Sequence, residues 1–205
     1  MTPLPRLYAI ADASFGDPVQ IAQSLIAGGA RLIQLRNKKA GAREFLAQAE
    51  RVLSMVPPSA RVIVNDRVDI ARISGAAGVH LGQTDLPPSM VRRILAADRI
   101  VGFSTHNLSQ ALDADKSQID YIAVGPIFPT STKQNPDPVV GLEGLAKIAR
   151  AVTRPVVAIG GITIENAGQV LRAGAQSVAV IRDLLDCSDV QARARQWLDA
   201  LEDRL

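Results

Sequence analysis

The sequence predicts a single α/β domain over residues 1–205, folded as a (β/α)8 TIM barrel. Short apolar runs alternate with amphipathic segments of helical period along the whole chain, at a spacing of roughly 25 residues. A chain of 205 residues is long enough for one well-buried core and short for two ordinary domains. Only 3% of the residues are aromatic, so Val, Ile, Leu and Ala must fill the core, as they do where helices cover a parallel sheet.

Eight apolar runs have the length and composition of buried strands. The predicted strands cover residues 7–11, 32–36, 62–65, 78–82, 100–104, 121–125, 156–160 and 177–181. Helix-like segments follow them, at residues 17–29, 42–55, 68–75, 87–97, 107–116, 141–152, 163–175 and 190–205. Asp17, Asn107 and either Thr163 or Asn166 are suitable near helix starts, and Gly28, Gly29, Gly75 and Gly174 suit helix ends.

An open doubly wound sheet also alternates strands and helices. Such a sheet usually has fewer strands and a glycine-rich first turn. The first turn here reads ADASFGD (residues 11–17), which lacks that glycine pattern. The closed barrel is therefore the preferred interpretation.

Composition and charge exclude several classes of protein. No stretch approaches the roughly 18 apolar residues of a membrane span, and the N-terminus lacks an export signal, so a cytoplasmic location is expected. The net charge of +3 and the scarcity of aromatic residues argue against a nucleic-acid partner. Cys187 is the only cysteine, which excludes an internal disulfide and a cysteine-based zinc site. The sequence does not determine the oligomeric state and is compatible with a homo-oligomer.

Polar side chains follow the predicted strands at their carboxyl ends, where the active site of such a barrel lies. In strand order these residues are Gln34, Arg36, Lys38 and Lys39; Asn65, Asp66 and Arg67; Gln83 and Asp85; Ser104, Thr105 and His106; Thr130, Ser131, Thr132 and Lys133; Gly160 and Gly161; and Arg182. We expect them to converge on one rim of the barrel.

Two carboxylates on this rim predict a metal site. Asp66 and Asp85 follow neighbouring strands, and with Asn65 and Gln83 they form an oxygen-ligand set suited to Mg2+. Taken singly, each carboxylate has a simpler explanation, because Asp66 and Asp85 could each cap the helix that follows. His80, inside the fourth strand, is expected to be a structural residue with satisfied hydrogen bonds.

Two anion-binding regions are expected on the same rim. Arg36 and Lys38 directly follow a strand, and guanidinium and ammonium groups both bind phosphate, although surface cations are the simpler reading. Gly160 and Gly161, in AIGGIT, lie where the loops after the seventh and eighth strands often form a phosphate site.

Residues 125–138, GPIFPTSTKQNPDP, form a long connection where about 2 to 6 residues are usual. Thr130, Thr132 and Lys133 could simply face solvent. Over a metal site, however, their hydroxyl and ammonium groups can wrap a diphosphate, and the prolines restrict the loop beforehand. The connection is therefore interpreted as a lid or clamp.

Eight segments stand in order at the strand ends: LYAIAD (7–12), IQLRNK (33–38), VNDRVDIA (64–71), GVHLGQTDLP (78–87), GFSTHN (102–107), YIAVGPIFPTSTK (121–133), VVAIGGI (156–162) and VAVI (178–181). In this combination the chain resembles the thiamine phosphate synthase family, also called thiamine-phosphate pyrophosphorylase. The resemblance covers essentially the whole chain, although AIGGI alone is shared by several phosphate-binding barrels.

The resemblance implies a transferase that uses Mg2+ to join 4-amino-5-hydroxymethyl-2-methylpyrimidine diphosphate to 4-methyl-5-(2-hydroxyethyl)thiazole phosphate, giving thiamine phosphate and pyrophosphate. It implies that the pyrimidine diphosphate is held by Gln34, Arg36, Lys38, Asn65, Thr132 and Lys133, and the metal by Asp66 and Asp85. It places near the thiazole phosphate or the pyrophosphate the residues Ser104, Thr130, Gly161 and Ile181. The expected catalytic residues are the cations that face the leaving group, Arg36, Lys38 and Lys133.

Two residues depart from the family pattern. Ala11 stands where many relatives have Thr, and Arg182 stands where Ser is common, so Arg182 either replaces a serine contact to phosphate or is a surface residue. Two alternative functions are a thiazole tautomerase, which shares the barrel and His106, and a catalytically silent phosphate-binding regulatory barrel. The first is expected to lack the paired carboxylates and the PTSTK segment, and the second to have lost Asp66, Asp85 or Lys133.

Overall fold

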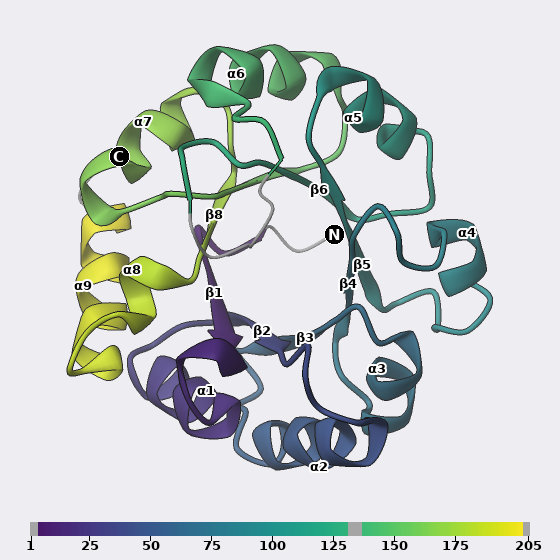
Figure 1. The fold of residues 1–205 in the computed structure, drawn as a ribbon, viewed down its shortest axis with the longest axis vertical. Helices are drawn as coiled ribbons and strands as arrows, with labels where there is room; N and C mark the ends of the chain where they lie inside the picture. Colours follow the sequence, from purple (N-terminus) through teal and green to yellow (C-terminus); the bar gives the residue numbers. More distant parts are fainter. Residues whose placement is uncertain (1–3, 131–136, 203–205) are drawn as a thin grey trace.

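Eight parallel strands close into a barrel in the computed structural model, which describes residues 4–130 and 137–202 (Figure 1). The strands are β1 (Leu7–Asp12), β2 (Leu32–Arg36), β3 (Arg61–Asn65), β4 (Gly78–Leu81), β5 (Ile100–Thr105), β6 (Tyr121–Val124), β7 (Val156–Ile159) and β8 (Ser177–Val180). They pair in sequence order, and β8 closes the barrel by pairing with β1, Leu7 opposite Val178. The predicted (β/α)8 barrel is confirmed.

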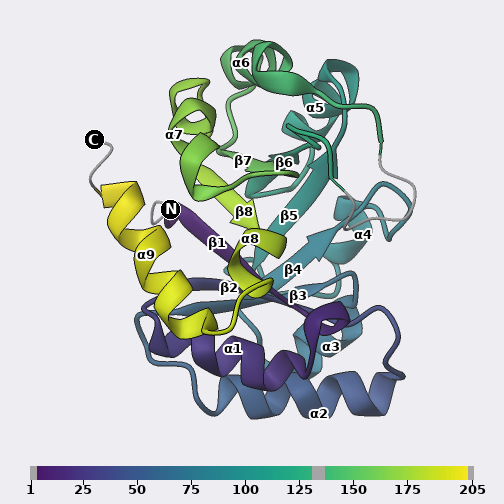
Figure 2. The ribbon, with the colours of Figure 1, turned by 60° about the vertical axis from the view of Figure 1, so that its left-hand side comes forward.

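Helices form an outer ring around the strands (Figure 1). They are η1 (Ala13–Phe15), α1 (Pro18–Ala27), α2 (Ala42–Leu53), α3 (Val68–Ser74), α4 (Pro88–Val91), α5 (Leu108–Asp115), α6 (Gly141–Ala151), α7 (Ile164–Arg172), α8 (Arg182–Leu185) and α9 (Val190–Glu202). Figure 2 shows α8 and α9 side by side beyond the end of β8. Within residues 4–130 and 137–202, no helix has the length and apolar character that crossing a membrane requires.

Helix starts use the predicted capping residues. The carboxylate of Asp17 accepts a hydrogen bond from the backbone N–H two residues on, at 2.9 Å, and the Asn107 side chain accepts one from the N–H three residues on, also at 2.9 Å. Thr163 and Asn166 form a capping box at the start of α7. In these three helices, α1, α5 and α7, side chains satisfy backbone N–H groups of the first turn that have no partner within the helix.

The helix expected over residues 87–97 is shorter than predicted. After Val91 the chain continues in tighter turns, in which the N–H of Arg93 bonds to the carbonyl of Met90. The guanidinium of Arg92 donates to Asp120 at 2.5 Å, and this bond ties the segment to the start of β6. The helices η1 and α8 were not predicted, because three or four residues are too few to show helical periodicity.

The inside of the barrel holds its own apolar cluster beneath the carboxyl ends of the strands. Its buried members are Tyr8, Ile10, Leu32, Ile63, Tyr121, Ala123, Val157 and Ala179. The chain has two tyrosines, and both lie in this cluster. Gly102 on β5 makes room for one of them, since a Cβ there would lie 2.0 Å from the ring of Tyr121. The floor of the barrel is thus closed by packed side chains.

Candidate active site

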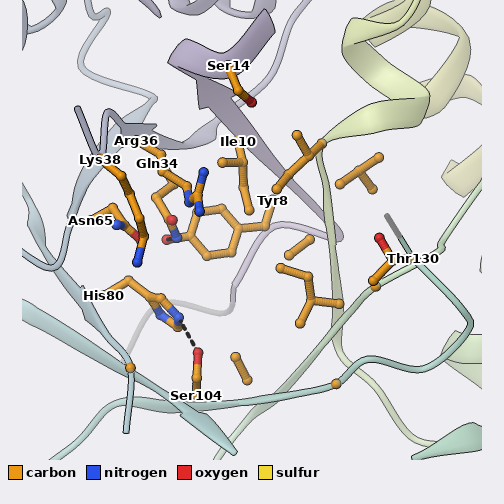
Figure 3. Close-up of a pocket in the computed structure, with 18 of the residues that line it drawn as sticks. Tyr8, Ile10, Ser14, Gln34, Arg36, Lys38, Asn65, His80, Ser104 and Thr130 are labelled. Atoms are coloured by element: carbon orange, nitrogen blue, oxygen red, sulfur yellow. Dashed lines mark hydrogen bonds between the residues drawn. The ribbon is translucent and has the colours of Figure 1, made fainter. Parts of the chain in front are cut away.

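A cavity of about 1500 Å3 opens at the carboxyl ends of the strands. It is lined by the described site residues that the family resemblance implied: Gln34, Arg36, Lys38, Asn65, Asp66, Asp85, Ser104, Thr130, Gly161 and Ile181. Arg67, which was expected on the same rim, does not line the cavity, because its guanidinium pairs with Asp69 at the surface of α3. Figure 3 shows Lys38 and Asn65 across the cavity from Thr130. Thr132 and Lys133 lie outside the described residues, so their part in the site stays a prediction.

Arg36, the last residue of β2, forms an ion pair with Asp12, the last residue of β1. The strand register places the two residues side by side. Asp12 is only 2% exposed, and it also accepts hydrogen bonds from the backbone N–H (2.9 Å) and the hydroxyl (2.8 Å) of Ser14. Because a guanidinium has five N–H donors, Arg36 keeps donors for an anion in the cavity. Asp12 was not predicted as a site residue, although a carboxylate ending an apolar strand was an available signal.

Asp66 has a φ of 61°, in the left-handed region that residues other than glycine rarely adopt. Its N–H donates to the carbonyl of His80 on β4 at 2.8 Å, and its carboxylate lies 3.0 Å from Nζ of Lys38. It does not cap α3, whose N-cap is Arg67. Strained backbone of this kind persists where the surroundings enforce it, and it is common at functional sites.

Asp85 lies next to Asp66 across the cavity rim. Its carboxylate accepts a hydrogen bond from the N–H of Gly82 at 2.7 Å and is within hydrogen-bonding reach of the Asp66 carboxylate. Burial raises the pKa of Asp85, and the neighbouring Asp66 charge raises it further, while the Gly82 N–H and Lys38 oppose the shift. Asp85 does not cap α4, which begins at two prolines without a side-chain cap. Both simpler explanations of these carboxylates were therefore wrong.

Five polar side chains form a continuous hydrogen-bonded chain beneath the cavity, called here the polar chain: Gln34, Tyr8, Tyr121, His80 and Ser104. Nε2 of Gln34 donates to the Tyr8 hydroxyl at 2.9 Å, and the two tyrosine oxygens lie 3.0 Å apart. Nδ1 of His80 lies 2.9 Å from the Tyr121 hydroxyl, and Nε2 lies 2.9 Å from Oγ of Ser104 (Figure 3). The prediction that His80 is hydrogen-bonded inside the barrel is confirmed.

Burial decides the charge state of the polar chain. It lowers the pKa of His80 to about 4, although the nearby Asp66 carboxylate opposes this shift. It also raises the pKa of Tyr8 and Tyr121 above the ordinary tyrosine range. The polar chain is therefore neutral near pH 7, in contrast to the ion pairs on the rim above it.

The opposite side of the cavity, at the ends of β6, β7 and β8, contains small residues and backbone groups. The N–H of Phe128 donates to the carbonyl of Gly160 at 3.0 Å, so the chain after β6 lies against the end of β7. Gly161 has a φ of 63°, and a Cβ there would lie 2.7 Å from both Cβ of Phe128 and the carbonyl oxygen of Pro129. Glycine is required at this contact, which brings Thr130 to the cavity wall.

Known proteins resemble this chain over nearly its whole length. Residues 7–184 match the family model described as thiamine monophosphate synthase. The chain belongs to the thiamine monophosphate synthase family. A relative from Koribacter versatilis named thiamine-phosphate synthase is 47% identical over 205 residues, which cover 97% of this chain and 96% of the relative. A relative of the same name from Shouchella clausii is 41% identical, with 97% of each chain covered.

A solved structure gives the same family likeness. The structure of thiamine phosphate pyrophosphorylase from Pyrococcus furiosus superposes with a TM-score of 0.89 at 37% identity, covering 98% of this chain and 96% of that chain. The predicted resemblance to the thiamine phosphate synthase family is thus confirmed.

In this member of the thiamine monophosphate synthase family, both ring nitrogens of His106 contact protein groups. Nδ1 lies 2.6 Å from the carbonyl oxygen of Gly125, and Nε2 lies 3.4 Å from the Asp137 carboxylate. Those two partners stand at the beginning and near the end of the 125–138 connection. His106 therefore joins the two stems of the segment that carries Thr130.

Arg182, where Ser is common in the thiamine monophosphate synthase family, begins α8. Its guanidinium lies 5.7 Å from the centre of the Phe15 ring, and Nη1 lies 3.4 Å from the Asp186 carboxylate. The side chain is 51% exposed. These contacts favour a surface role for Arg182 at the edge of the cavity.

Proposed function

We propose that this protein is a thiamine phosphate synthase, a transferase of thiamine biosynthesis. It joins 4-amino-5-hydroxymethyl-2-methylpyrimidine diphosphate to 4-methyl-5-(2-hydroxyethyl)thiazole phosphate and releases pyrophosphate. The observation that carries the proposal is one cavity with two kinds of wall, in a chain of this family: facing carboxylates and cations on one side, closely packed glycines on the other. The charged wall suits a diphosphate with its metal, and the glycine wall suits a single phosphate group.

The two substrates take opposite sides of the cavity on this proposal. The pyrimidine diphosphate lies at the ends of β2 and β3 and is bound by Gln34, Arg36, Lys38, Asn65, Thr132 and Lys133. The thiazole phosphate and the adjacent pyrophosphate oxygens are bound by Ser104, Thr130, Gly161 and Ile181. Lys38 is 57% exposed, which leaves its ammonium free to turn from the Asp66 carboxylate toward a phosphate oxygen.

Mg2+ is proposed to bind between Asp66 and Asp85. The two carboxyl groups are within hydrogen-bonding reach, and a divalent cation would relieve their repulsion. Within residues 4–130 and 137–202 no group of three or more His, Cys, Asp or Glu side chains is arranged to hold a metal. The remaining ligands would be water and diphosphate oxygens, as is usual for Mg2+. When bound, the ion supplies positive charge next to the leaving group.

The reaction requires stabilisation of a leaving group rather than a protein nucleophile. The bond between the pyrimidine methylene carbon and the diphosphate oxygen breaks, and the oxygen keeps the electron pair. The electron-rich aminopyrimidine ring carries the positive charge, while Arg36, Lys38 and Lys133 face the pyrophosphate. Each close pair of unit charges contributes roughly 4 kcal/mol at an effective dielectric of about 20, before desolvation.

The second step forms the new bond. The thiazole nitrogen donates its lone pair to the cationic carbon, and the product is thiamine phosphate. The bound thiazole phosphate fixes the position of that nitrogen, so orientation is the second contribution of the site.

The proposal is tested by mixing the purified protein with Mg2+ and both substrates and measuring thiamine phosphate by chromatography. We expect product with Mg2+ and none after chelation, and Asp66→Ala or Asp85→Ala should lower the rate by about 100-fold or more. Asp69→Ala is a matched control, because Asp69 pairs with Arg67 at the surface of α3. No product above background, or full activity in both site variants, would contradict the proposal.

The two alternatives give different results in the same assay. A thiazole tautomerase would need His106 as its acid–base group, yet both ring nitrogens of His106 contact Gly125 and Asp137, and the facing carboxylates would have no role. A silent regulatory barrel would bind the phosphate-bearing substrates without forming thiamine phosphate. Product formation therefore excludes the second alternative directly.

A further inference from the structure

The polar chain joins the two sides of the cavity. Gln34 stands at one end, on β2, and Ser104 stands at the other, on β5. Both line the cavity, as do Tyr8 and His80 between them, although each tyrosine is at most 1% exposed. The ring of Tyr8 meets that of Tyr121 edge to face, with centroids 5.9 Å apart, and the His80 ring stacks on Tyr121 at 5.6 Å. The three middle residues are therefore held in fixed positions.

The protons of the polar chain can be assigned one after another. Each tyrosine hydroxyl has one proton, and a neutral imidazole has one N–H donor and one acceptor nitrogen. The Tyr8 oxygen accepts from Gln34, so its own proton points to the oxygen of Tyr121. The proton of Tyr121 then points to Nδ1 of His80, because a buried hydroxyl needs an acceptor. The ring proton is left on Nε2, which donates to Ser104.

This order of donors fixes what each end of the polar chain offers to a ligand. Gln34 directs one N–H of its NH2 group to Tyr8, so its amide oxygen is not used within the polar chain and can accept a hydrogen bond from a ligand. Ser104 accepts from His80, so its hydroxyl proton is left to donate. If every hydrogen bond of the polar chain ran in the opposite direction, Gln34 would offer a donor to the ligand and Ser104 would offer an acceptor. The two ends are thus coupled through the middle.

We propose that Tyr8, Tyr121 and His80 are positioning residues that hold the polar chain in this one direction. The cavity then selects a ring with an exocyclic amino group at Gln34 and an anionic oxygen at Ser104. This inference rests on the proposed function, in which the pyrimidine carries an amino group and the diphosphate carries the oxygens. With the hydrogen bonds in this direction, Gln34 can accept from the amino group and Ser104 can donate to a phosphate oxygen.

The middle of the polar chain can be broken without touching either end. Tyr121→Phe removes the acceptor of the Tyr8 proton, so Tyr8 should turn and donate to the amide oxygen of Gln34. The Gln34 amide would then flip and offer its NH2 group to the ligand. Tyr8→Phe instead removes the partner of Gln34, which leaves its amide without a fixed direction. Ser177→Ala is a matched control, since it deletes a buried hydroxyl from the first residue of β8, outside the cavity.

The first experiment measures binding by calorimetry, with Mg2+ and without the thiazole. The probes are 4-amino-5-hydroxymethyl-2-methylpyrimidine diphosphate and its 4-oxo counterpart, which presents an acceptor where the first presents a donor. The unaltered protein should bind the amino compound more tightly. Tyr121→Phe should shift the ratio of the two dissociation constants toward the oxo compound by about tenfold or more. Tyr8→Phe should make the two dissociation constants more similar. Ser177→Ala should leave their ratio unchanged. Equal weakening of both probes in Tyr121→Phe would overturn the proposal, since that is the effect of structural damage alone.

The second experiment does not depend on substrate. The chain has two histidines, so long-range proton–nitrogen NMR should show two imidazole systems, and His106→Gln identifies the remaining one as His80. We expect the ring proton of His80 on Nε2. A proton on Nδ1 would overturn the proposed direction even if binding followed the expected pattern. Should the protein bind neither probe, the proposed function has failed, and this spectrum still decides the direction of the polar chain.

Discussion

The β1–β4 side of the cavity and its β6–β8 side are formed by different kinds of residue. On the first side, charged groups already have charged partners, Arg36 with Asp12 and Lys38 with Asp66. On the second side, the wall is formed mainly by small and apolar residues and by backbone groups, with Gly161 packed too closely for a side chain. Buried charge is costly without a partner, so the first side depends on electrostatic pairing, whereas the second depends on shape. Substitutions should therefore damage the two sides in different ways.

The largest effect is expected where a charge loses its partner. Arg36→Met leaves the Asp12 carboxylate buried and uncompensated, so the free energy of unfolding should fall by about 3 kcal/mol. Thiamine phosphate formation should fall by about 100-fold or more, because a cation facing the diphosphate is lost. Urea unfolding and steady-state kinetics measure the two losses separately.

The double variant Asp12→Asn/Arg36→Met separates structure from function on this side. Removing both charges leaves no uncompensated carboxylate, so most of the lost stability should return. Activity should stay low, because the cation is still missing. If activity returned together with stability, Arg36 would act only by supporting the fold.

On the shape-dependent side, Gly161→Ala should be the most damaging small change. The added Cβ would meet Phe128 and Pro129 at 2.7 Å, and the φ of 63° is unfavourable for alanine, so a loss of about 3 kcal/mol is expected. Gly75→Ala is the matched control, because φ is 76° there and no atom lies within 4 Å of the added Cβ. It should cost only about 1 kcal/mol.

Kinetics should show which substrate the glycine wall serves. In Gly161→Ala, KM should rise for the thiazole phosphate and change little for the pyrimidine diphosphate. Gly75→Ala should change neither value. An equal rise for both substrates would show that the two sides do not act separately.

Below both walls, the two buried tyrosines should make the free energy of unfolding depend on pH, with an effect of intermediate size. Burial raises the pKa of Tyr8 and Tyr121, so the folded protein keeps them protonated where the unfolded chain ionises near pH 10. Their contribution to stability is full below that pH and is lost as the pH rises above it. For two tyrosines the expected loss is about 2 kcal/mol near pH 10.5. Alkaline titration should show no tyrosinate absorbance until unfolding; gradual ionisation of the folded protein would contradict this.

Much of the rim could be predicted because it depends on local pattern. Gln34, Asp66 and Gly161 each stand near the carboxyl end of a strand whose apolar run can be recognised in the sequence, and a parallel barrel brings such ends together. The same logic placed Asp85 and Ser104 correctly in the cavity. Thr132 and Lys133 remain predictions from their position in the 125–138 connection.

The features that escaped prediction depend on pairing between distant segments. The Asp12–Arg36 pair follows from the register of β1 and β2, which no single segment specifies. Tyr8 and Tyr121 are 113 residues apart, and each fits the pattern of an ordinary buried strand residue. The sequence therefore could not predict the polar chain. The left-handed backbone of Asp66 likewise occurs together with a hydrogen bond from its N–H to the carbonyl of His80 on the next strand.

The smallest effect is expected for a substitution of Arg182, which tests whether the shape-dependent side contains a charge that binds substrate. Arg182 is half-exposed, and its contacts with Phe15 and Asp186 are of the kind that contributes less than about 1 kcal/mol. Arg182→Ser should therefore leave the urea midpoint almost unchanged and raise KM for the thiazole phosphate by less than about threefold. A tenfold rise confined to that substrate would mean that the guanidinium reaches the phosphate. The second side would then use charge as the first side does, and the contrast between them would not hold.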